Sequence, residues 1–261
     1  MLTKNQKQSL TRFLRMATSI VLFLVAWEIV SRLGLVHPSL FPPPSRVFLA
    51  LIEMARTGEL ARDVRASLWR AALGFVFGGA AGIAIGLLTG RLKKVDNYLS
   101  PLIQLFRPLP PVAIIPLVIV WFGIGEVSKV FSIAFAVFFP VWINAHLGAC
   151  EVPLTFLWSA QTLGVKNVRL LWKVIFPAAL PFAVAGLRTG VSLAFIMVFV
   201  SELAGASAGI GYQISVSYLA YRVDRMMAAL AVLGLFGAGA DFLLTRLAWL
   251  AFPWLKLAAQ R

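Results

Sequence analysis

The sequence predicts an all-α polytopic membrane protein, a helical bundle with six transmembrane helices. Of its 261 residues, 60% are hydrophobic and only 13% are charged, and the mean hydropathy is +0.88. So little charge cannot cover the surface of a soluble enzyme. One cysteine and two histidines argue against a disulfide scaffold and a metal site. The net charge is +14, and the basic residues lie between apolar segments. The expected partner is therefore a lipid bilayer and not nucleic acid.

Six segments have the length that a helix needs to cross the roughly 30 Å hydrocarbon core. They are 17–36, 71–90, 99–122, 130–149, 181–201 and 226–251. Cations precede the first segment as in a signal peptide, but no small-residue cleavage site follows it, which favours an uncleaved span. We therefore expect a cytoplasmic segment at 1–16, one transmembrane domain over 17–251 and a cytoplasmic tail at 252–261.

The distribution of Lys and Arg between the spans predicts the orientation. With the N-terminus inside, fourteen of these cations fall in cytoplasmic segments and nine in external ones. Cytoplasmic loops carry the excess of positive charge in membrane proteins. Both termini are therefore expected in the cytoplasm.

The external loop at 37–70 has structure of its own. Three prolines end at Pro44, Ser45 is placed as a helix N-cap, and apolar residues recur on one face of 46–56. Gly58 ends this helix, and a second amphipathic stretch leads into the next span. An interfacial brace explains the pattern, and the rim of a transport pathway is the alternative.

The second span carries a ladder of glycines, which recur at every fourth position and therefore stay near one helix face. They are Gly74, Gly78, Gly82, Gly86 and Gly90. Glycine at these positions allows a neighbouring helix to approach closely in lipid. The ladder predicts a packing seam within the subunit, the alternative being a face that slides during transport.

The third span cannot be a regular helix, because Arg107 is followed by Pro108, Pro110 and Pro111. Irregular backbone at membrane depth needs protein or a water-filled cavity around it. Arg107 therefore either faces a cytoplasmic vestibule or extends to the lipid headgroups.

The few ionisable residues inside the spans are candidates for function. Glu28 and Arg32 are four residues apart and are expected to pair. Glu202 ends the fifth span. Arg188 lies within that span without an acid nearby in sequence, so it either pairs with Asp241 of the last span or lines the pathway.

The cytoplasmic segment at 151–180 is too polar to span the membrane. Pro153 suits the first turn of a short helix, and Gly164 suits its C-terminal turn. A second helix follows, which Pro177 and Pro181 are expected to stop before the fifth span. Such a segment would be a rigid docking element that transmits a push to the fourth and fifth spans.

This segment resembles the coupling motif of ABC importer permeases, which is Glu-Ala-Ala, three residues, Gly, nine residues and Ile-x-Leu-Pro. The matching positions are Trp158, Ser159, Ala160, Gly164, Val174, Phe176 and Pro177. The motif's glutamate is replaced by Trp158 and one alanine by Ser159, while the spacing from glycine to proline is intact.

Further blocks are similar to the nitrate, aliphatic sulfonate and taurine branch of that family, over about residues 40–250. They lie at 41–44, 107–111, 121–126, 139–140, 162–164, 177–181, 186–188, 201–206 and 209–212, with Asp241. The resemblance implies a type I ABC importer permease-like fold in a bacterial inner membrane. It also implies a second permease copy, two cytoplasmic ATPase subunits and an external solute-binding protein.

The function implied is a permease subunit that forms the pathway of a small solute, an anion such as nitrate, a sulfonate or taurine. The sequence holds no Gly-x-x-x-x-Gly-Lys-Ser/Thr loop, so ATP and Mg²⁺ are expected in the ATPase partner, with no cofactor in this chain and no enzyme activity of its own. The candidate pathway residues are Arg107, Pro110, Arg188, Glu202, Gly209, Gly211 and Tyr212.

Two other classes of membrane protein are compatible with parts of the sequence. An ion-coupled secondary transporter would use broken helices too, with Glu28 or Asp241 carrying a proton. It predicts inverted repeats, which the sequence does not display. A membrane scaffold fits the composition but leaves the prolines after Arg107 without an explanation.

Overall fold

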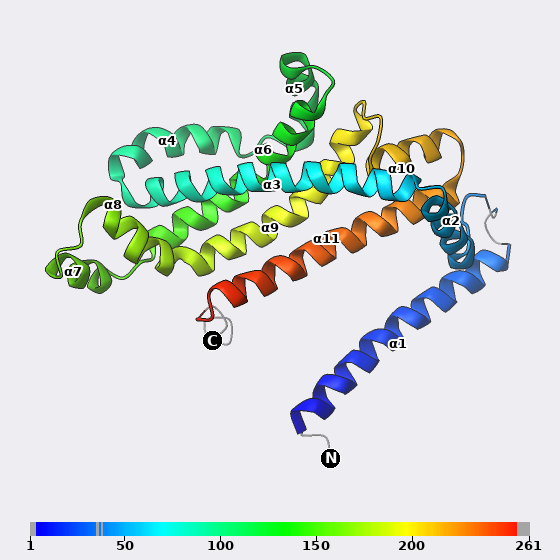
Figure 1. Ribbon diagram of the computed structural model, residues 1–261, viewed down its shortest axis with the longest axis horizontal. Helices are drawn as coiled ribbons and strands as arrows, with labels where there is room; N and C mark the ends of the chain where they lie inside the picture. The colour runs from blue at the N-terminus through cyan, green and yellow to red at the C-terminus, as the bar shows by residue number, and fades with distance from the viewer. Residues whose placement is uncertain (1–3, 35–36, 38, 255–261) are drawn as a thin grey trace. The chain divides into compact units, whose positions relative to one another are not determined.

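The computed structural model describes residues 4–34, 37 and 39–254, and this part of the chain is helical without strands. Figure 1 shows the helices in order along the chain. They are α1 (Lys4–Arg32), α2 (Pro44–Arg56), α3 (Glu59–Arg91), α4 (Lys93–Phe106), the 3-10 turn η1 (Pro111–Ile114), α5 (Ile115–Phe122), α6 (Glu126–Cys150), α7 (Leu154–Thr162), α8 (Asn167–Leu170), the π-turn η2 (Leu171–Ile175), α9 (Phe176–Leu203), α10 (Ile210–Leu219) and α11 (Val223–Ala251). Of the expected cytoplasmic ends, 1–16 and 252–261, residues 1–3 and 255–261 lie outside the described residues, and the chain from Lys4 onward belongs to α1.

The chain divides into two compact units. One consists of Met1–Ala61 with Gln213–Ala231, and the other of Arg62–Tyr212 with Val232–Arg261. The second unit holds most of the apolar helices and all the residues of the coupling motif.

Four helical segments of the described chain are long and apolar enough to cross a bilayer: Glu59–Arg91, Glu126–Cys150, Val168–Leu203 and Val223–Ala251. A fifth crossing is formed if Lys93–Phe106 and Pro111–Phe122 are taken together, with a bend of 88° between them. The expected break after Arg107 is therefore confirmed. The expected first span falls on α1, and its residues 35–36 lie outside the described part.

The second unit is built around the packing of α6 against α9. Ile133, Val137 and Val141 of α6 are fully buried with Ala194 and Val198 of α9. These close apolar contacts suit an interface inside a membrane domain, where van der Waals packing holds the helices together.

The glycine ladder of α3 faces α6, as the predicted seam requires. A Cβ atom on Gly82 would lie 2.8 Å from Val141 Cβ, and one on Gly86 would lie 2.6 Å from Ala145 Cβ. The other three ladder glycines meet α6 in the same way: Gly74 faces Ile133, Gly78 faces Ala134 and Gly90 faces His146. The helices approach too closely for any side chain at these positions, so the ladder is a packing seam within one subunit.

In the first unit, Glu28 of α1 organises the start of α2. Its carboxylate accepts hydrogen bonds from the backbone N–H of Ser45 (3.0 Å) and from the Ser45 hydroxyl (2.8 Å), and it forms the expected pair with Arg32 (2.6 Å). The expected N-cap role of Ser45 is wrong, because α2 begins at Pro44 and its cap position lies two residues earlier than expected, at Pro43. Proline at the first helical position loses no bond, so the first free N–H is that of Ser45, which Glu28 satisfies.

The loop that was expected to brace the interface is held by ion pairs within the first unit. Glu53 of α2 pairs with Arg225 at 2.7 Å, and Glu59 at the start of α3 pairs with the same arginine at 3.3 Å. Arg222 pairs with Asp224 at 3.0 Å. These pairs fix α2 and the start of α3 to the N-terminal end of α11, and the role of the loop as an interfacial brace stays a prediction.

One expected helix end is wrong. Pro177 and Pro181 do not stop the helix before the fifth span, because the chain stays helical from Val168 to Leu203. The π-turn at Leu171–Ile175 ends two residues before Pro177. A π-turn shifts the hydrogen-bond register by one residue, which lets the helix continue past a residue that has no N–H.

Candidate functional site: the coupling segment and the polar groups of the membrane helices

The short helix α7 ends in a glycine turn. Gly164 has φ of 78°, the left-handed conformation that favours glycine. Its N–H donates to the Gln161 carbonyl (2.9 Å), and the next N–H, of Val165, donates to the Ala160 carbonyl (2.9 Å). These two bonds form a Schellman motif, which ends the helix sharply and fixes the direction of the chain after it.

The segment is anchored to the membrane helices by a small apolar core. Leu157 of α7 and Ile175 of η2 are both 1% exposed. They pack with Leu87 near the end of α3, Ala149 near the end of α6 and Ala179 of α9. A force on α7 would therefore reach three membrane helices, α3, α6 and α9, through buried apolar contacts.

The residues at the coupling-motif positions divide between this core and the surface. Trp158 is 61% exposed, Ser159 is exposed and Ala160 is buried. Val174, Phe176 and Pro177 are half-buried. The exposed face of α7 thus carries a tryptophan where the motif has glutamate, so this face offers an apolar contact surface.

Arg188 and Asp241 form the expected pair between α9 and α11. Arg188 Nε donates to Asp241 Oδ1 at 2.9 Å, and Arg188 Nη2 donates to Oδ2 at 3.0 Å. The pair is not buried, because the side chains are 51% and 34% exposed. Arg188 lies about 18 Å from the first residue of α9 and about 22 Å from the last, at 1.5 Å per residue. A charged pair exposed at that depth needs an aqueous or protein environment.

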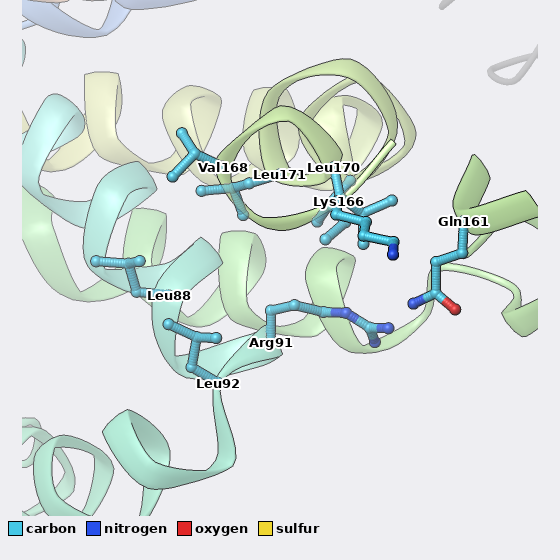
Figure 2. Close-up of a pocket in the computed structure, with 9 residues that line it drawn as sticks. Leu88, Arg91, Leu92, Gln161, Lys166, Val168, Leu170 and Leu171 are labelled. Atoms are coloured by element: carbon cyan, nitrogen blue, oxygen red, sulfur yellow. The ribbon is translucent and has the colours of Figure 1, made fainter. Parts of the chain in front are cut away.

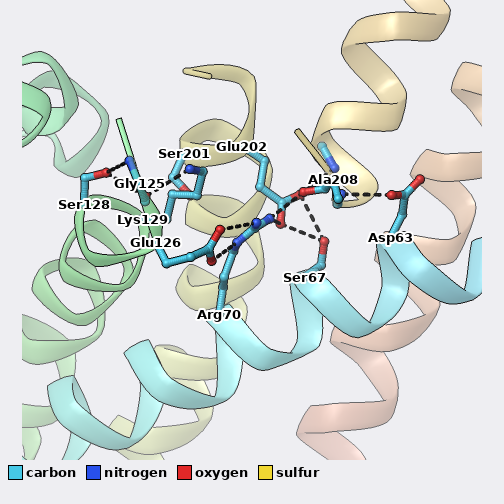
Figure 3. A network of polar contacts seen from close by, with 12 residues as sticks. Asp63, Ser67, Arg70, Gly125, Glu126, Ser128, Lys129, Ser201, Glu202 and Ala208 are labelled. Carbon is cyan, nitrogen blue, oxygen red and sulfur yellow. Dashed lines mark hydrogen bonds and ion pairs between the residues drawn. The ribbon is translucent and has the colours of Figure 1, made fainter. Parts of the chain in front are cut away.

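A second polar cluster, the Arg70 network, joins α3, α6 and α9 (Figure 3). Arg70, only 4% exposed, donates to both oxygens of the Glu126 carboxylate at 2.6 Å. Its Nη1 donates to Glu202 Oε1 and to the Ala208 carbonyl, both at 2.7 Å. The hydroxyl of Ser67, which is fully buried, donates to the same Glu202 carboxylate at 2.8 Å. The arginine is thus shared between a buried and an exposed acid.

The network also accepts hydrogen bonds from the free backbone N–H groups at the N-terminus of α10. The N–H of Gly211 donates to Glu202 Oε2 (2.8 Å), and the N–H of Gly209 donates to Asp63 Oδ1 (3.1 Å). The N–H of Ile210 donates to Ser67 Oγ (2.8 Å). Gly209 has φ of 135°, and a Cβ there would collide with the Glu202 carboxylate. The glycines are required because backbone donors wrap closely around the acid.

The candidate pathway residues therefore lie in different places. Three of them, Glu202, Gly209 and Gly211, meet in the buried Arg70 network, while Tyr212 follows it at the start of α10. Arg107 and Pro110 are exposed in the link between α4 and η1, and Arg188 lies apart from both. Their role along a pathway stays a prediction.

Three residues of this network, Asp63, Ser67 and Arg70, are not among the candidates that the sequence provides. They fall in the expected external loop at 37–70. One signal was available, since Asp63, Ser67 and Arg70 recur at helical spacing on α3. Their partners, however, are more than fifty residues away in the chain, a distance at which a single sequence carries no pairing signal.

Known proteins are similar to this chain in sequence and in fold. Residues 82–251 match the family model described as "Binding-protein-dependent transport system inner membrane component". The chain belongs to this family.

Relatives of the permease cover most of its length. The taurine transport system permease protein TauC of Escherichia coli is 34% identical over 222 residues, which are 83% of this chain and 81% of TauC. The aliphatic sulfonates transport permease protein SsuC of Bacillus subtilis is 36% identical over 218 residues, or 84% of this chain and 79% of SsuC. The MetNI methionine ABC transporter in an inward-facing conformation shares the fold, with a TM-score of 0.64, 20% identity and coverage of 74% of this chain and 96% of that one.

The chain is therefore the permease subunit of an ABC importer, an inner-membrane component with the fold of a type I importer permease. In this family ATP hydrolysis belongs to a separate subunit, and partners of the permease include an ATPase and a solute-binding protein. Family membership excludes the ion-coupled secondary transporter that the sequence left open.

Proposed function

We propose that this permease carries a small organic sulfonate, such as taurine or an alkanesulfonate, across a bacterial inner membrane. Two relatives that cover more than four fifths of the chain are named for taurine and aliphatic sulfonates. The observation that carries the proposal is Arg188, a half-exposed guanidinium at mid-depth whose Nη1 has no hydrogen-bond partner among the described residues. A guanidinium binds the oxygens of a sulfonate by charge-assisted hydrogen bonds.

The assembly that we propose contains two identical permease copies, two cytoplasmic ATPase subunits and one external solute-binding protein. The exposed Arg188–Asp241 pair supports a second copy, because two copies around a shared aqueous pathway would give this pair a polar environment. ATP and Mg²⁺ bind in the ATPase subunits, since the permease sequence holds no phosphate-binding loop.

In the proposed mechanism the coupling segment, 151–180, is the contact with the ATPase. Trp158 and Ser159 on the exposed face of α7 meet the ATPase surface, and the apolar core under α7 transmits its movement to α6 and α9. Arg188 lies on α9, so ATP-driven movement of this helix changes which side of the membrane its guanidinium faces.

Uptake of labelled taurine, an alkanesulfonate and nitrate tests the substrate, in cells that express the permease with its ATPase and its binding protein. We expect uptake of the sulfonates, loss of that uptake in Arg188→Ala, and partial uptake in Arg188→Lys, which keeps the charge but not the planar donor pair. Arg246→Ala is the matched control. Arg246 lies on α11, the helix of Asp241, where it stacks on Phe242 and pairs with no acid among the described residues. Its loss should leave uptake unchanged.

The variants should stay folded, because an ion pair exposed to water contributes about 1 kcal/mol or less. Thermal unfolding in detergent checks this. Wild-type sulfonate uptake by Arg188→Ala would remove Arg188 from the pathway, and uptake of nitrate without sulfonates would contradict the substrate class.

A further inference from the structure

A cavity of about 620 Å³ lies beside the coupling helix, between the end of α3 and the turn that joins α7 to α8. Its two sides differ in chemistry, as Figure 2 shows. Leu88, Leu92 and Val168 form an aliphatic side, while the guanidinium of Arg91, the ammonium of Lys166 and the amide of Gln161 lie together on the other. The cavity is thus amphipathic, with two cations at its polar end.

The two cations have no acidic partner in the described part of the chain. Neither Arg91 nor Lys166 takes part in any of the ion pairs that the structure forms there. The acids on neighbouring elements, Asp96 and Glu151, do not line the cavity, and Asp96 is engaged with Ser100 and His146. Two cations at one cavity repel each other, so an anion between them would be bound favourably.

The position of the cavity along α3 indicates the kind of anion. Arg91 is the last residue of α3, one residue beyond the uncharged segment 71–90. Leu88 lies about 4.5 Å deeper along the same helix. The cavity therefore spans the level at which phosphate headgroups pass into acyl chains. The expected orientation places this level in the cytoplasmic leaflet, whose anionic lipids attract basic groups.

We propose that this cavity binds an anionic phospholipid of the cytoplasmic leaflet. The phosphate contacts Arg91 and Lys166, Gln161 donates to an ester or glycerol oxygen, and the first part of an acyl chain lies against Leu88, Leu92 and Val168. This inference rests on the proposed orientation but not on the proposed solute.

The bound lipid would have a mechanical role. Arg91 belongs to α3, whereas Lys166 belongs to the turn that follows the Gly164 cap of α7. A phosphate held by both cations links the coupling segment to the membrane helix beside it. Transport driven by the ATPase then depends on the anionic lipid content of the bilayer.

Native mass spectrometry of the full-length permease in detergent tests the site, with phosphatidylglycerol, phosphatidylcholine or soluble glycerol 3-phosphate added. We expect phosphatidylglycerol to be retained and phosphatidylcholine to be retained much less. Loss of two cations near the membrane surface should lower phosphatidylglycerol affinity roughly thirtyfold, equivalent to about 2 kcal/mol. The variant is Arg91→Gln with Lys166→Gln.

The matched control is Arg169→Gln with Lys173→Gln, which removes the same charge from cations of the same segment that do not line the cavity. It should keep wild-type lipid retention. Equal loss in both double variants would reduce the effect to general surface charge and overturn the site. Equal competition by glycerol 3-phosphate would also overturn it, because a soluble phosphate would then suffice without an acyl chain.

A second measurement separates the lipid from a protein contact and from a folding defect. The permease, its ATPase and its binding protein are reconstituted in nanodiscs with and without phosphatidylglycerol, and ATPase activity stimulated by the loaded binding protein is recorded. Phosphatidylglycerol should raise this stimulation in wild type and not in Arg91→Gln/Lys166→Gln. A variant that loses ATPase binding even in pure phosphatidylcholine would show that the cavity serves the ATPase instead.

Discussion

At the scale of single residues, Arg70 illustrates how one side chain can hold a membrane domain together. It is buried and bonds two carboxylates that differ in exposure: Glu202 is fully buried, while the side chain of Glu126 is 60% exposed. The buried acid cannot be solvated if the arginine is removed, whereas the exposed one can. The two halves of the network should therefore contribute very different free energies.

We predict that Arg70→Ala lowers the free energy of unfolding by about 3–5 kcal/mol, because it leaves Glu202 as a buried charge without its cation. Glu126→Ala should cost about 1 kcal/mol or less, since its partner keeps Glu202 and the Ala208 carbonyl. Thermal or denaturant unfolding in detergent measures both. Equal losses in the two variants would contradict the assignment of the stability to the buried half.

The backbone conformation of Gly164 ends the helix that we expect to couple the permease to its ATPase. A Cβ there would touch nothing within 4 Å, so the cost of a side chain comes from φ of 78° alone. We predict that Gly164→Val, with roughly 1–3 kcal/mol of local strain, uncouples ATP hydrolysis from solute uptake, while the permease still inserts in the membrane. Uptake and ATP hydrolysis are measured together in proteoliposomes.

Asparagine tolerates the left-handed conformation better than other residues with side chains. Gly164→Asn is therefore the control, and it should retain most of the coupling. Normal uptake by Gly164→Val, with the ATPase present, would mean that the turn has no role in docking.

At the scale of helices, packing in the second unit follows two different rules. The contact between α6 and α9 uses Ile, Val and Ala side chains, whereas α3 meets α6 through its glycine ladder. Glycine lowers helix propensity, but it lets the backbones of α3 and α6 approach closely. A Cβ atom on Gly78 would collide with the backbone of Ala134. The seam thus fixes the distance and rotation of α3 relative to α6.

We predict that Gly82→Ala destabilises the permease by about 1–3 kcal/mol, because the added methyl group overpacks against Val141 and the Phe138 carbonyl. Gly234→Ala is the matched control on α11, where a Cβ meets nothing within 4 Å. It should be neutral or slightly stabilising through helix propensity. The measurement is the melting temperature of each variant in detergent, compared with that of the wild type. A Gly82→Ala variant as stable as the wild type would argue against a rigid seam.

At the scale of the whole molecule, the cations expected outside the membrane and those expected inside differ in how many form ion pairs. The cations expected outside are largely engaged in ion pairs, such as those of Arg70, Arg222 and Arg225. Of the cations expected inside, Arg91, Lys166, Arg169 and Lys173 form no ion pair among the described residues. Among the described residues, the basic charge available to lipid headgroups is therefore concentrated in the segments expected inside, which include the turn after α7.

We predict from this distribution that α7 lies in the cytoplasm and the turn after α2 lies outside. Cysteines introduced at Ser159 and Thr57, both exposed, in a Cys150→Ser background report on each side. A membrane-impermeant maleimide added to intact spheroplasts should label Thr57→Cys at once and Ser159→Cys only after lysis. Labelling of Ser159→Cys in intact spheroplasts would reverse the orientation.

The sequence by itself determined the membrane class, most of the spans, the broken third span and the coupling segment with its glycine turn. These features depend on local composition and spacing: apolar length, proline chemistry and the left-handed turn at Gly164. The pair of Arg188 with Asp241 is one of the two alternatives that the sequence leaves open, because a guanidinium at that depth needs an acid or an aqueous pathway.

Only the tertiary structure decided the Arg70 network, the amphipathic cavity at Arg91 and the continuous helix past Pro177. In the network, Asp63, Ser67 and Arg70 bond residues more than fifty positions away. The cavity needs Arg91 and Lys166 on facing elements. The helix continues past Pro177 because a π-turn precedes it. The network and the cavity depend on which elements face each other in space, and periodicity along one chain carries no record of that. The π-turn depends on the hydrogen-bond register of the helix, which the prolines alone do not indicate.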